Sequence, residues 1–405
     1  MAHAVIVGAG PAGAALAYLL VRRDIDVTLI ERYTDFAREF RGEVLLPGGL
    51  QALAQMGLWE KLQDVPQVRL AAAELYINGS RRLRAALDPQ AFKGYPPRWV
   101  SQPALLELLV TEAGAHPSFR LERGATVRDL LLEGGRVVGV RVHSERGERE
   151  IRADLVIGAD GRTSVVRRRA GLPVVEDRIP MDIVWCKVPW PRFLGEDRAI
   201  RAYLGGGRLL VAAPVYDGRL QIGWVIRKGS FGEIRSRGMA ACLEEMARHV
   251  DPDLAAHLRR HRDGAIEPFL LWTIADRVTQ WTAAGVLVIG DAAHTMSPVG
   301  AQGVNVALRD AIVAANHLVP ALGAPATAAG IDAACHRIQG ERAREVRIVQ
   351  RLQAGPPRVL LSDAWWARAA LQGLGLFVRL QLGRIRAGAL VGRFAFGVTD
   401  VRLQV

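Results

Sequence analysis

Three acidic residues stand where a side chain can meet a ligand, each at the carboxyl end of a short apolar run: Glu31, Asp160 and Asp291. A carboxylate in this position can accept hydrogen bonds from the hydroxyls of a bound sugar. Asp160 is followed by Gly161, and Asp291 is preceded by Gly290. One such acid-glycine pair is an ordinary turn, but two pairs, each beside a buried strand, indicate a binding site.

A glycine loop near the start of the chain supplies a second kind of chemistry. An apolar run over residues 4–8 leads into Gly8-Ala9-Gly10-Pro11-Ala12-Gly13, and a helical pattern follows over 14–23. Glycines permit a tight turn and close approach of the backbone to a pyrophosphate, whose charge the helix N-terminus attracts. A second apolar run, 27–30, then ends at Glu31. The order predicts a dinucleotide site that uses Gly8, Gly10, Ala12, Gly13 and Glu31.

The segment 285–311 predicts a strand over 286–289, a turn at Gly290-Asp291 and a helix that begins near Gly303. A loop with Pro298 and Gly300 joins the turn to the helix. The free backbone N–H groups of a helix N-terminus suit a ligand that carries or develops negative charge. The segment therefore fits a ligand with hydroxyls at one end and an anionic edge at the other.

Composition argues against several other functions. The formal net charge is +12, but the arginines that carry it are scattered, without basic blocks or interleaved aromatic residues, so nucleic acid is not an expected partner. A positive field helps to attract anionic ligands such as a phosphorylated nicotinamide cofactor. The nine histidines show no metal-ligand spacing. Cys186, Cys242 and Cys335 are expected to be buried or incidental thiols in a reducing cytoplasm.

No targeting or membrane-spanning segment is expected. The chain enters an apolar strand directly after Met1-Ala2-His3, which leaves no room for a signal peptide. No uninterrupted apolar run approaches the ~20 residues that span a bilayer, and the apolar stretch 369–392 is interrupted by arginines. We therefore expect a cytoplasmic protein.

Together, the motifs resemble those of the class A flavoprotein monooxygenases, the p-hydroxybenzoate hydroxylase-like family. Residues 8–13 with Glu31-Arg32 are similar to the family's FAD fingerprint, and Gly158-Ala159-Asp160-Gly161-Arg162 is similar to its Asp-Gly motif, which is linked to FAD and NAD(P)H. Residues 290–294, followed by Pro298 and the stretch 300–305, are similar to its Gly-Asp motif. The resemblance covers roughly residues 1–350.

The resemblance implies how non-covalent FAD would be held. Glu31, followed by Arg32, would bind the adenosine ribose, and Gln102 would lie near the FAD phosphates. Asp291 would bind the ribityl hydroxyls. The backbone N–H groups of Gly303, Val304 and Asn305 would face the flavin pyrimidine.

Two residues are expected to act in catalysis. By the resemblance, Arg41 would lie beside the flavin and the nicotinamide, and the carbonyl of Pro298 would face the flavin ring and the substrate. His294 lies in a motif that is usually structural, so we expect it to orient the loop rather than transfer a proton.

The fold implied is α/β: a Rossmann-like FAD-binding domain with an inserted α+β substrate domain that carries a mostly antiparallel sheet, and C-terminal helices. Apolar runs between 181 and 226 with a tight turn at Asp217-Gly218 independently indicate that sheet. The division has three parts: residues 1–70, 98–177 and 276–350 for the FAD-binding domain, 71–97 and 178–275 for the substrate domain, and 351–405 for a C-terminal helical region.

The activity implied is NAD(P)H- and FAD-dependent monooxygenation, in which a flavin C4a-hydroperoxide transfers one oxygen atom from O2. NADPH is slightly preferred to NADH. A small aromatic or polyketide-like substrate is expected, and the assembly would be a monomer or a homodimer. Aromatic residues could line the substrate pocket, although plain core positions explain them equally well: Trp185, Tyr203, Trp224, Phe269 and Trp272.

Other functions fit the same scaffold. A flavin-dependent reductase of an apolar, isoprenoid-like substrate could use the apolar and basic stretch 364–396 as a membrane-surface contact or a pocket wall, although packing on the FAD-binding domain is preferred. A non-catalytic flavin-binding protein would have no need of Arg41 or Pro298. A flavin-dependent halogenase is disfavoured, because Gly223-Trp224-Val225-Ile226 does not match the Trp-x-Trp-x-Ile-Pro motif.

Overall fold

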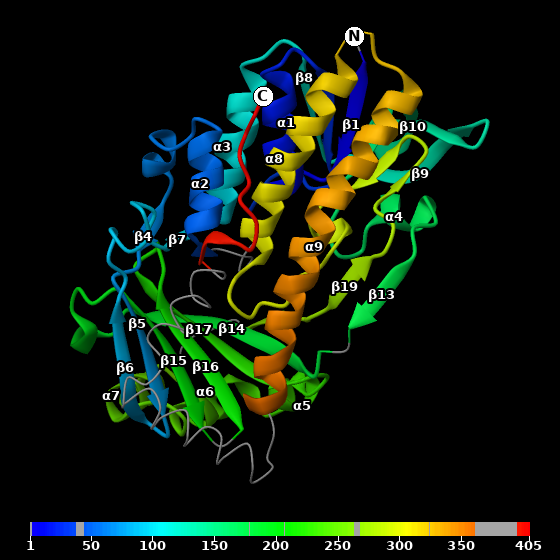
Figure 1. The fold of residues 1–405 in the computed structure, drawn as a ribbon. Helices are drawn as coiled ribbons and strands as arrows, with labels where there is room; N and C mark the ends of the chain where they lie inside the picture. The colour runs from blue at the N-terminus through cyan, green and yellow to red at the C-terminus, as the bar shows by residue number, and fades with distance from the viewer. Residues whose placement is uncertain are drawn as a thin grey trace.

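The computed structural model describes residues 2–37, 44–177, 179–205, 207–262, 268–323, 325–360 and 395–405. Its two largest sheets lie one above the other in Figure 1. Helix α8 (Gly303–Leu322) passes along the upper sheet, and the longer α9 (Ala328–Leu360) passes along both. The predicted catalytic residue Arg41 and almost all of the apolar and basic stretch 364–396 lie outside the described residues.

The upper sheet contains the strands that end in the three acidic motifs. Its order is β20-β21-β12-β1-β2-β8, parallel except for the antiparallel edge strand β20. The strand bounds are β1 (His3–Val7), β2 (Asp26–Glu31), β8 (Phe119–Arg123), β12 (Leu155–Gly158), β20 (Thr282–Ala283) and β21 (Val286–Val288). The carboxyl ends of parallel strands meet at one sheet edge, where α/β folds bind ligands. The Rossmann-like prediction is confirmed.

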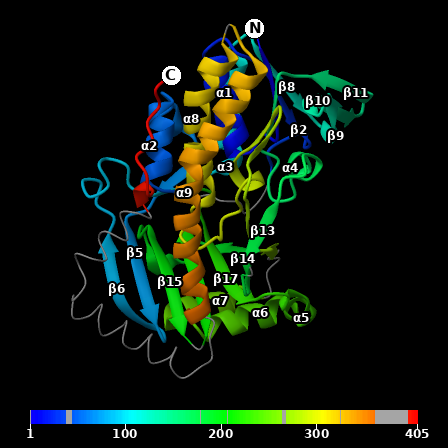
Figure 2. The same cartoon turned by 45° about the vertical axis from the view of Figure 1, so that its right-hand side comes forward.

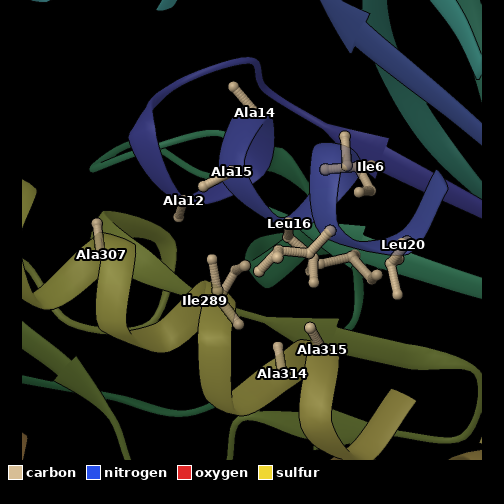
Figure 3. Packing of buried hydrophobic residues seen from close by; sticks show 14 of the residues in the cluster. Ile6, Ala12, Ala14, Ala15, Leu16, Leu20, Ile289, Ala307, Ala314 and Ala315 are labelled. Atoms are coloured by element: carbon tan, nitrogen blue, oxygen red, sulfur yellow. The ribbon is translucent and has the colours of Figure 1, made fainter. Parts of the chain in front are cut away.

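Helix α1 (Pro11–Val21) packs closely on α8 because small residues face each other across the contact. Figure 3 shows Ala12 of α1 near Ala307 of α8, with Ile289 at the end of β21 close by. Leu16 of α1 is fully buried in the same cluster. Alanines let the two helix backbones approach, so the glycine loop before α1 lies near the start of α8.

Smaller elements surround the upper sheet. Helix α3 (Gln102–Gly114) begins directly after Ser101, which is its N-cap. Strands β9 and β10 form a hairpin within the antiparallel sheet β11-β10-β9. The remaining bounds here are β9 (Thr126–Glu133), β10 (Arg136–Ser144), β11 (Gly147–Arg152), α4 (Val165–Arg169), α2 (Pro47–Gln55), η1 (Lys61–Asp64), and β3 (Val44–Leu45), β7 (Arg98–Val100) and β4 (Gln67–Arg69), which form a small sheet.

The lower sheet has the order β18-β14-β17-β16-β15-β5-β6 and is antiparallel except between β15 and β5. One face packs on α6 and α7, and the other faces the upper half of the molecule (Figures 1 and 2). The bounds are β5 (Ala72–Ile77), β6 (Ser80–Ala86), β14 (Met181–Pro189), η2 (Arg192–Leu194), β15 (Ala199–Gly205), β16 (Arg208–Pro214), β17 (Arg219–Arg227), α5 (Phe231–Ser236), α6 (Gly238–Ala247), α7 (Pro252–Arg260) and β18 (Phe269–Leu271). The mostly antiparallel sheet expected from the sequence is therefore confirmed.

Two strands and one long helix link the two halves, in addition to the chain segments between β4 and β5 and between β6 and β7. Strands β13 (Val174–Asp177) and β19 (Ala275–Val278) form a two-stranded ribbon between them, and α9 runs along both (Figures 1 and 2). Helix α9 also crosses the expected boundary at 350/351, and residues 397–405 form neither helix nor strand. The division into domains remains a proposal.

Three further observations concern partners. No helix in the described ranges combines the length and apolar character needed to cross a membrane. Among the same residues, no three His, Cys, Asp or Glu side chains converge as metal ligands. Cys186, Cys242 and Cys335 are buried, free thiols, and burial raises the pKa of each.

Candidate functional site

The glycine loop contains glycines of two kinds. Gly8 has φ +99°, and a Cβ there would lie 2.5 Å from the carbonyl oxygen of Ala159, while a Cβ on Gly13 would lie 2.0 Å from that of Gly8. A Cβ on Gly10 would meet no atom of the described residues within 4 Å. Gly8 and Gly13 are therefore required by the protein's own packing. Gly10, the N-cap of α1 without a side-chain cap, leaves its backbone open to a ligand such as a pyrophosphate.

Glu31 lies beside this loop at the end of β2. Its side chain is 4% exposed and accepts hydrogen bonds from the amides of Ala9 at 3.0 Å and Tyr33 at 3.1 Å. These bonds fix the carboxylate next to the glycine turn, the position that the ribose role requires. The neighbouring Arg32 is exposed and lies over the ring of Tyr33.

Asp160 uses its carboxylate within its own motif. It accepts hydrogen bonds from the Ser164 hydroxyl at 2.5 Å and from the amides of Val165 at 2.6 Å and Val166 at 3.2 Å. Burial raises the pKa of Asp160, although these hydrogen bonds oppose the rise. The carboxylate thus caps α4 and holds the turn at Gly161, which has φ +79°. A direct contact of Asp160-Gly161 with a cofactor stays a prediction.

Two arginines of the Asp-Gly motif region contact the Gly-Asp motif and hold the two motifs together. Arg162 Nε lies 3.4 Å from Oδ2 of Asp291, whose side chain is 35% exposed. Arg167 is buried, donates to the carbonyl of Ala292 at 3.2 Å and pairs with Asp276 at 3.2 Å. The structure therefore places the two acid-glycine motifs side by side, each at the carboxyl end of one of two neighbouring parallel strands.

The turn at Gly290 also packs against the glycine loop. Gly290 has φ +58°, and a Cβ there would lie 2.9 Å from Cβ of Ala12. The turn continues as η3 (Gly290–Ala292), which directs Asp291 away from the buried Gly290. The glycine loop, the Asp-Gly motif and the Gly-Asp motif thus converge on one edge of the upper sheet.

His294 helps to hold this turn in place through a shared contact with Asp310. It is 1% exposed, and its Nε2 lies 2.7 Å from Oδ2 of Asp310 on α8, which also accepts from the Gly290 amide at 3.1 Å. Burial opposes ionisation of Asp310, but the charges of His294 and Arg342 hold its pKa down at about 2. Asp310, which sequence analysis did not single out, therefore fixes the turn to α8, and His294 has an orienting position.

The N-terminus of α8 is open, as the anion-binding role requires. It has no side-chain cap, and a Cβ on Gly303 would meet nothing within 4 Å among the described residues. The Asn305 side chain has a structural role. It accepts a hydrogen bond from the amide of Leu46 at 2.9 Å and donates to the carbonyls of Val44 at 3.1 Å and Ala301 at 2.7 Å. The backbone amides of Val304 and Asn305 lie in the first turn of α8. The Asn305 side chain hydrogen-bonds to the backbone of β3 and so holds that strand against the helix.

The loop with Pro298 and Gly300 is held by a helix that the sequence did not connect with it. Gln353 on α9 is 1% exposed and donates to the carbonyls of Ser297 at 2.9 Å and Val299 at 2.7 Å. Pro298 between them is half-buried. Its carbonyl accepts the Ala301 amide at 3.1 Å. Gln102, by contrast, is half-buried at the first position of α3.

The structure separates the aromatic residues proposed for substrate binding. Tyr203 and Trp224 lie on the face of the lower sheet that packs on α6 and α7, where the Tyr203 hydroxyl donates to Asp251 at 2.7 Å. Trp185 and Phe269 are directly paired across β14 and β18, so they share the opposite face. Trp272 is 57% exposed.

The face with Trp185 is the one that meets the Pro298 loop. Trp185 and Val299 both pack on the cluster of Met181, Ile183 and Val225. Trp185 also packs, with Ala301, on a second cluster that contains Trp99, whose ring centroid is 6.5 Å from that of Trp185. A ligand reaching from the sheet edge towards the lower sheet would meet Trp185 and Phe269, not Tyr203 and Trp224.

Comparison with known proteins agrees with this geometry. A family model described as an FAD binding domain matches residues 1–347. The chain is 35% identical over 319 residues to the 6-methylpretetramide 4-monooxygenase of Streptomyces rimosus, covering 76% of this chain and 73% of that protein. It is 28% identical over 331 residues to squalene epoxidase 3 of Arabidopsis thaliana, covering 78% of this chain but only 60% of that protein.

The fold has close counterparts among solved structures. The p-nitrophenol 4-monooxygenase PnpA from Pseudomonas putida DLL-E4 superposes with a TM-score of 0.81 over 99% of this chain and 100% of that one. The two sequences are 18% identical, so the likeness is one of fold.

Proposed function

The chain belongs to the class A flavoprotein monooxygenases, an FAD-dependent enzyme family, and from this premise we propose that it oxygenates a planar polycyclic aromatic molecule of the polyketide type. NADPH is the proposed reductant and O2 the oxygen source. The observation that carries the substrate class is the pair of aromatic residues, Trp185 and Phe269, on the sheet face that meets the Pro298 loop. The name of the Streptomyces rimosus relative supports the same class.

That surface is wide as well as apolar. Directly paired residues place Phe269, Trp185, Gly223 and Val211 in one row across four strands. Neighbouring strands are roughly 4.8 Å apart, so the row extends over roughly 14 Å. A row of this length matches several fused rings better than a single ring, and an aromatic face suits stacking on them.

The residues of the site fit FAD as a cofactor. Gly10 leaves room for a pyrophosphate, Glu31 holds a carboxylate for a ribose, and Asp291 offers a part-exposed carboxylate between them and α8. When bound, FAD would take a hydride from NADPH and, with O2, supply the oxygen atom that is transferred.

The protein's own part is to hold charge, exclude water and aim the substrate. The amides at Gly303–Asn305 would stabilise negative charge on the flavin edge, as helix N-termini do. Gln353 fixes the backbone on both sides of Pro298, so the loop presents a constant surface to the substrate. Roles for Arg41, Gln102 and Asp160 in binding FAD or NADPH are part of this proposal.

A second candidate substrate is an apolar isoprenoid chain, which would be epoxidised. The similarity to squalene epoxidase 3 supports it. The reductase that the sequence left open is replaced by this alternative, because the family to which the chain belongs consists of monooxygenases.

The test uses the purified full chain with FAD, NADPH and isotopically labelled O2. Polycyclic phenols, single-ring phenols and squalene are compared for the rate of flavin reduction and for label in the product. The proposal expects labelled product and faster reduction with polycyclic phenols. Labelled product from squalene alone, or from single-ring phenols alone, would reject the substrate class.

A further inference from the structure

Residues 395–405, here called the C-terminal strap, lie against both α2 and α8 (Figure 1). Two amide side chains clasp the outer part of the strap. Gln55 of α2 donates to the carbonyl of Val401 at 3.2 Å and accepts from the amide of Leu403 at 2.7 Å. Asn316 of α8 does the same with the next residues, donating to the carbonyl of Arg402 and accepting from the amide of Gln404, both at 2.8 Å.

The inner part of the strap is held by buried charges. Glu345 of α9 accepts from the amide of Val398 and the hydroxyl of Thr399, each at 2.9 Å. Arg309 of α8 donates to the carbonyls of Phe396 at 2.8 Å and Thr399 at 2.5 Å. The strap therefore supplies partners to one negative and one positive side chain.

Room for these charges depends on Gly397. Its φ is +89°, and a Cβ there would lie 2.6 Å from Cζ of Arg309 and 2.7 Å from Oε1 of Glu345. The strap and the charged pair are therefore fitted to each other.

The same charges continue to the Gly-Asp motif. Glu345 pairs with Arg309 at 2.8 Å and with Arg342, and Arg342 Nε lies 2.7 Å from Oδ1 of Asp310. The other oxygen of Asp310 holds the Gly290 amide and His294. An unbroken chain of ionic hydrogen bonds thus runs from the strap to the turn that carries Asp291.

Burial makes the members of this chain depend on each other. The side chains of Asp310, Arg342 and Glu345 are fully buried, and that of Arg309 is 6% exposed. A buried charge that loses a partner is destabilised strongly, because little water is present to replace it. If the strap undocks, Glu345 loses two donors and Arg309 loses three acceptors, the carbonyls of Phe396 and Thr399 and the Thr399 hydroxyl, and Arg342 and Asp310 must readjust.

We propose that the strap and the FAD site are coupled through this ion chain, so that a docked strap sets the orientation of the Gly290-Asp291 turn and bound FAD tightens the strap. Asp310, Arg342 and Glu345 are positioning residues in this arrangement. Coupling between two sites is reciprocal in free energy, so each effect predicts the other. The inference requires FAD as cofactor but is independent of the proposed substrate.

The test loosens the strap without changing the ion chain. The double variant Gln55→Ala/Asn316→Ala removes the outer clasp, and FAD affinity of the apoprotein is measured by flavin fluorescence. Allosteric couplings typically change affinity roughly 5- to 150-fold, and we expect a loss of FAD affinity near the lower end of this range. Gln63→Ala is the matched control, because Gln63 is an exposed amide that bonds to the carbonyl of Trp59, away from the strap. Its FAD affinity should equal that of the wild type.

Hydrogen exchange supplies a readout that does not depend on activity. The amides of Val398, Leu403 and Gln404 donate to α9, α2 and α8, and FAD should slow their exchange in the wild type. Thr399→Val, which removes one donor to Glu345 and one acceptor of Arg309, should change FAD affinity in the same direction. A lower melting temperature with unchanged FAD affinity, or strap exchange that FAD does not alter, would overturn the coupling.

Discussion

The indole ring of Trp185 lies over Gly223 of the neighbouring strand, where a Cβ would stand 2.6 Å from the ring. The two residues are directly paired in β14 and β17. Because Gly223 has no side chain, the ring occupies the surface of two strands and forms the centre of the proposed substrate platform.

The variant Gly223→Ala should displace this ring while leaving the FAD site unchanged. An aromatic contact is worth about 0.5–1.5 kcal/mol, so substrate affinity should fall roughly 2- to 10-fold. Titration of the FAD-loaded enzyme with a polycyclic phenol measures the effect. Trp185→Ala should weaken binding further.

Trp224→Phe is the control for this prediction, because Trp224 lies on the other face of the same sheet. It should lower the free energy of unfolding by about 1–2 kcal/mol through lost packing and leave substrate affinity unchanged. Equal losses of substrate affinity in the Trp185 and Trp224 variants would argue against the platform.

Alanine variants of Gly10 and Gly13 should distinguish a glycine that the cofactor needs from a glycine that the protein's own packing needs. Gly10→Ala adds a methyl group that meets no described atom within 4 Å, so the apoprotein should keep its melting temperature. FAD affinity should fall roughly tenfold, a loss of about 1.4 kcal/mol, because the methyl group keeps the pyrophosphate from the backbone. Gly13→Ala places a methyl group 2.0 Å from the Gly8 carbonyl and should destabilise the apoprotein itself. Melting curves of both apoproteins and FAD titrations check the pair. A Gly10→Ala protein with normal FAD affinity would show that the loop does not approach the cofactor.

Removing the hydrogen bonds that hold the Pro298 loop should uncouple NADPH oxidation from product formation. Gln353→Leu keeps a similar volume but deletes the hydrogen bonds to Ser297 and Val299. The loop should then aim the substrate less well, so a larger share of NADPH should yield hydrogen peroxide rather than product. The ratio of product to NADPH consumed measures this loss of coupling, and an unchanged ratio would count against the role of Gln353.

The buried ion chain should give the protein a marked acid sensitivity. Burial opposes ionisation of Asp310 and Glu345, but the adjacent arginines, with His294 at Asp310, lower each pKa to about 2. In an unfolded chain the two groups titrate near their ordinary values of about 4. Their contribution to stability is therefore complete above about pH 5 and is lost as the pH falls towards 2.

Urea unfolding between pH 6 and pH 3 tests this linkage. The contribution is on the order of 2–3 kcal/mol for each group, so the free energy of unfolding should fall more steeply in the wild type than in Glu345→Gln. Glu133→Gln is the control, since Glu133 is an exposed partner of Arg152, and its profile should follow that of the wild type. Parallel profiles for the wild type and Glu345→Gln would contradict the prediction.

Much of the cofactor site was readable from the sequence because its rules are local. A glycine with positive φ, an apolar run and an acid at its end are recorded within a few residues, so the parallel strands, α1 and the start of α8 were predicted where they occur. The resemblance to a known family then assigned Glu31, Asp291 and the Gly303 helix start to one FAD site, and the structure brings all three to one edge of the upper sheet.

Other features were decided only by the tertiary structure. Trp185 and Trp224 look alike in the sequence, but the register that pairs Val184 with Trp224 puts them on opposite faces. The carboxylate of Asp160 caps its own helix, which its motif alone did not indicate.

The sequence by itself therefore determined the fold class and a dinucleotide site, because strand ends, glycine turns and helix starts follow from neighbouring residues, while the resemblance of its motifs to a known family implied that the dinucleotide is FAD. Only the tertiary structure decided which aromatic face meets the Pro298 loop and that Glu345 joins the strap to Asp310. Those relationships depend on strand register and on buried charges more than thirty residues apart, and no local pattern records either.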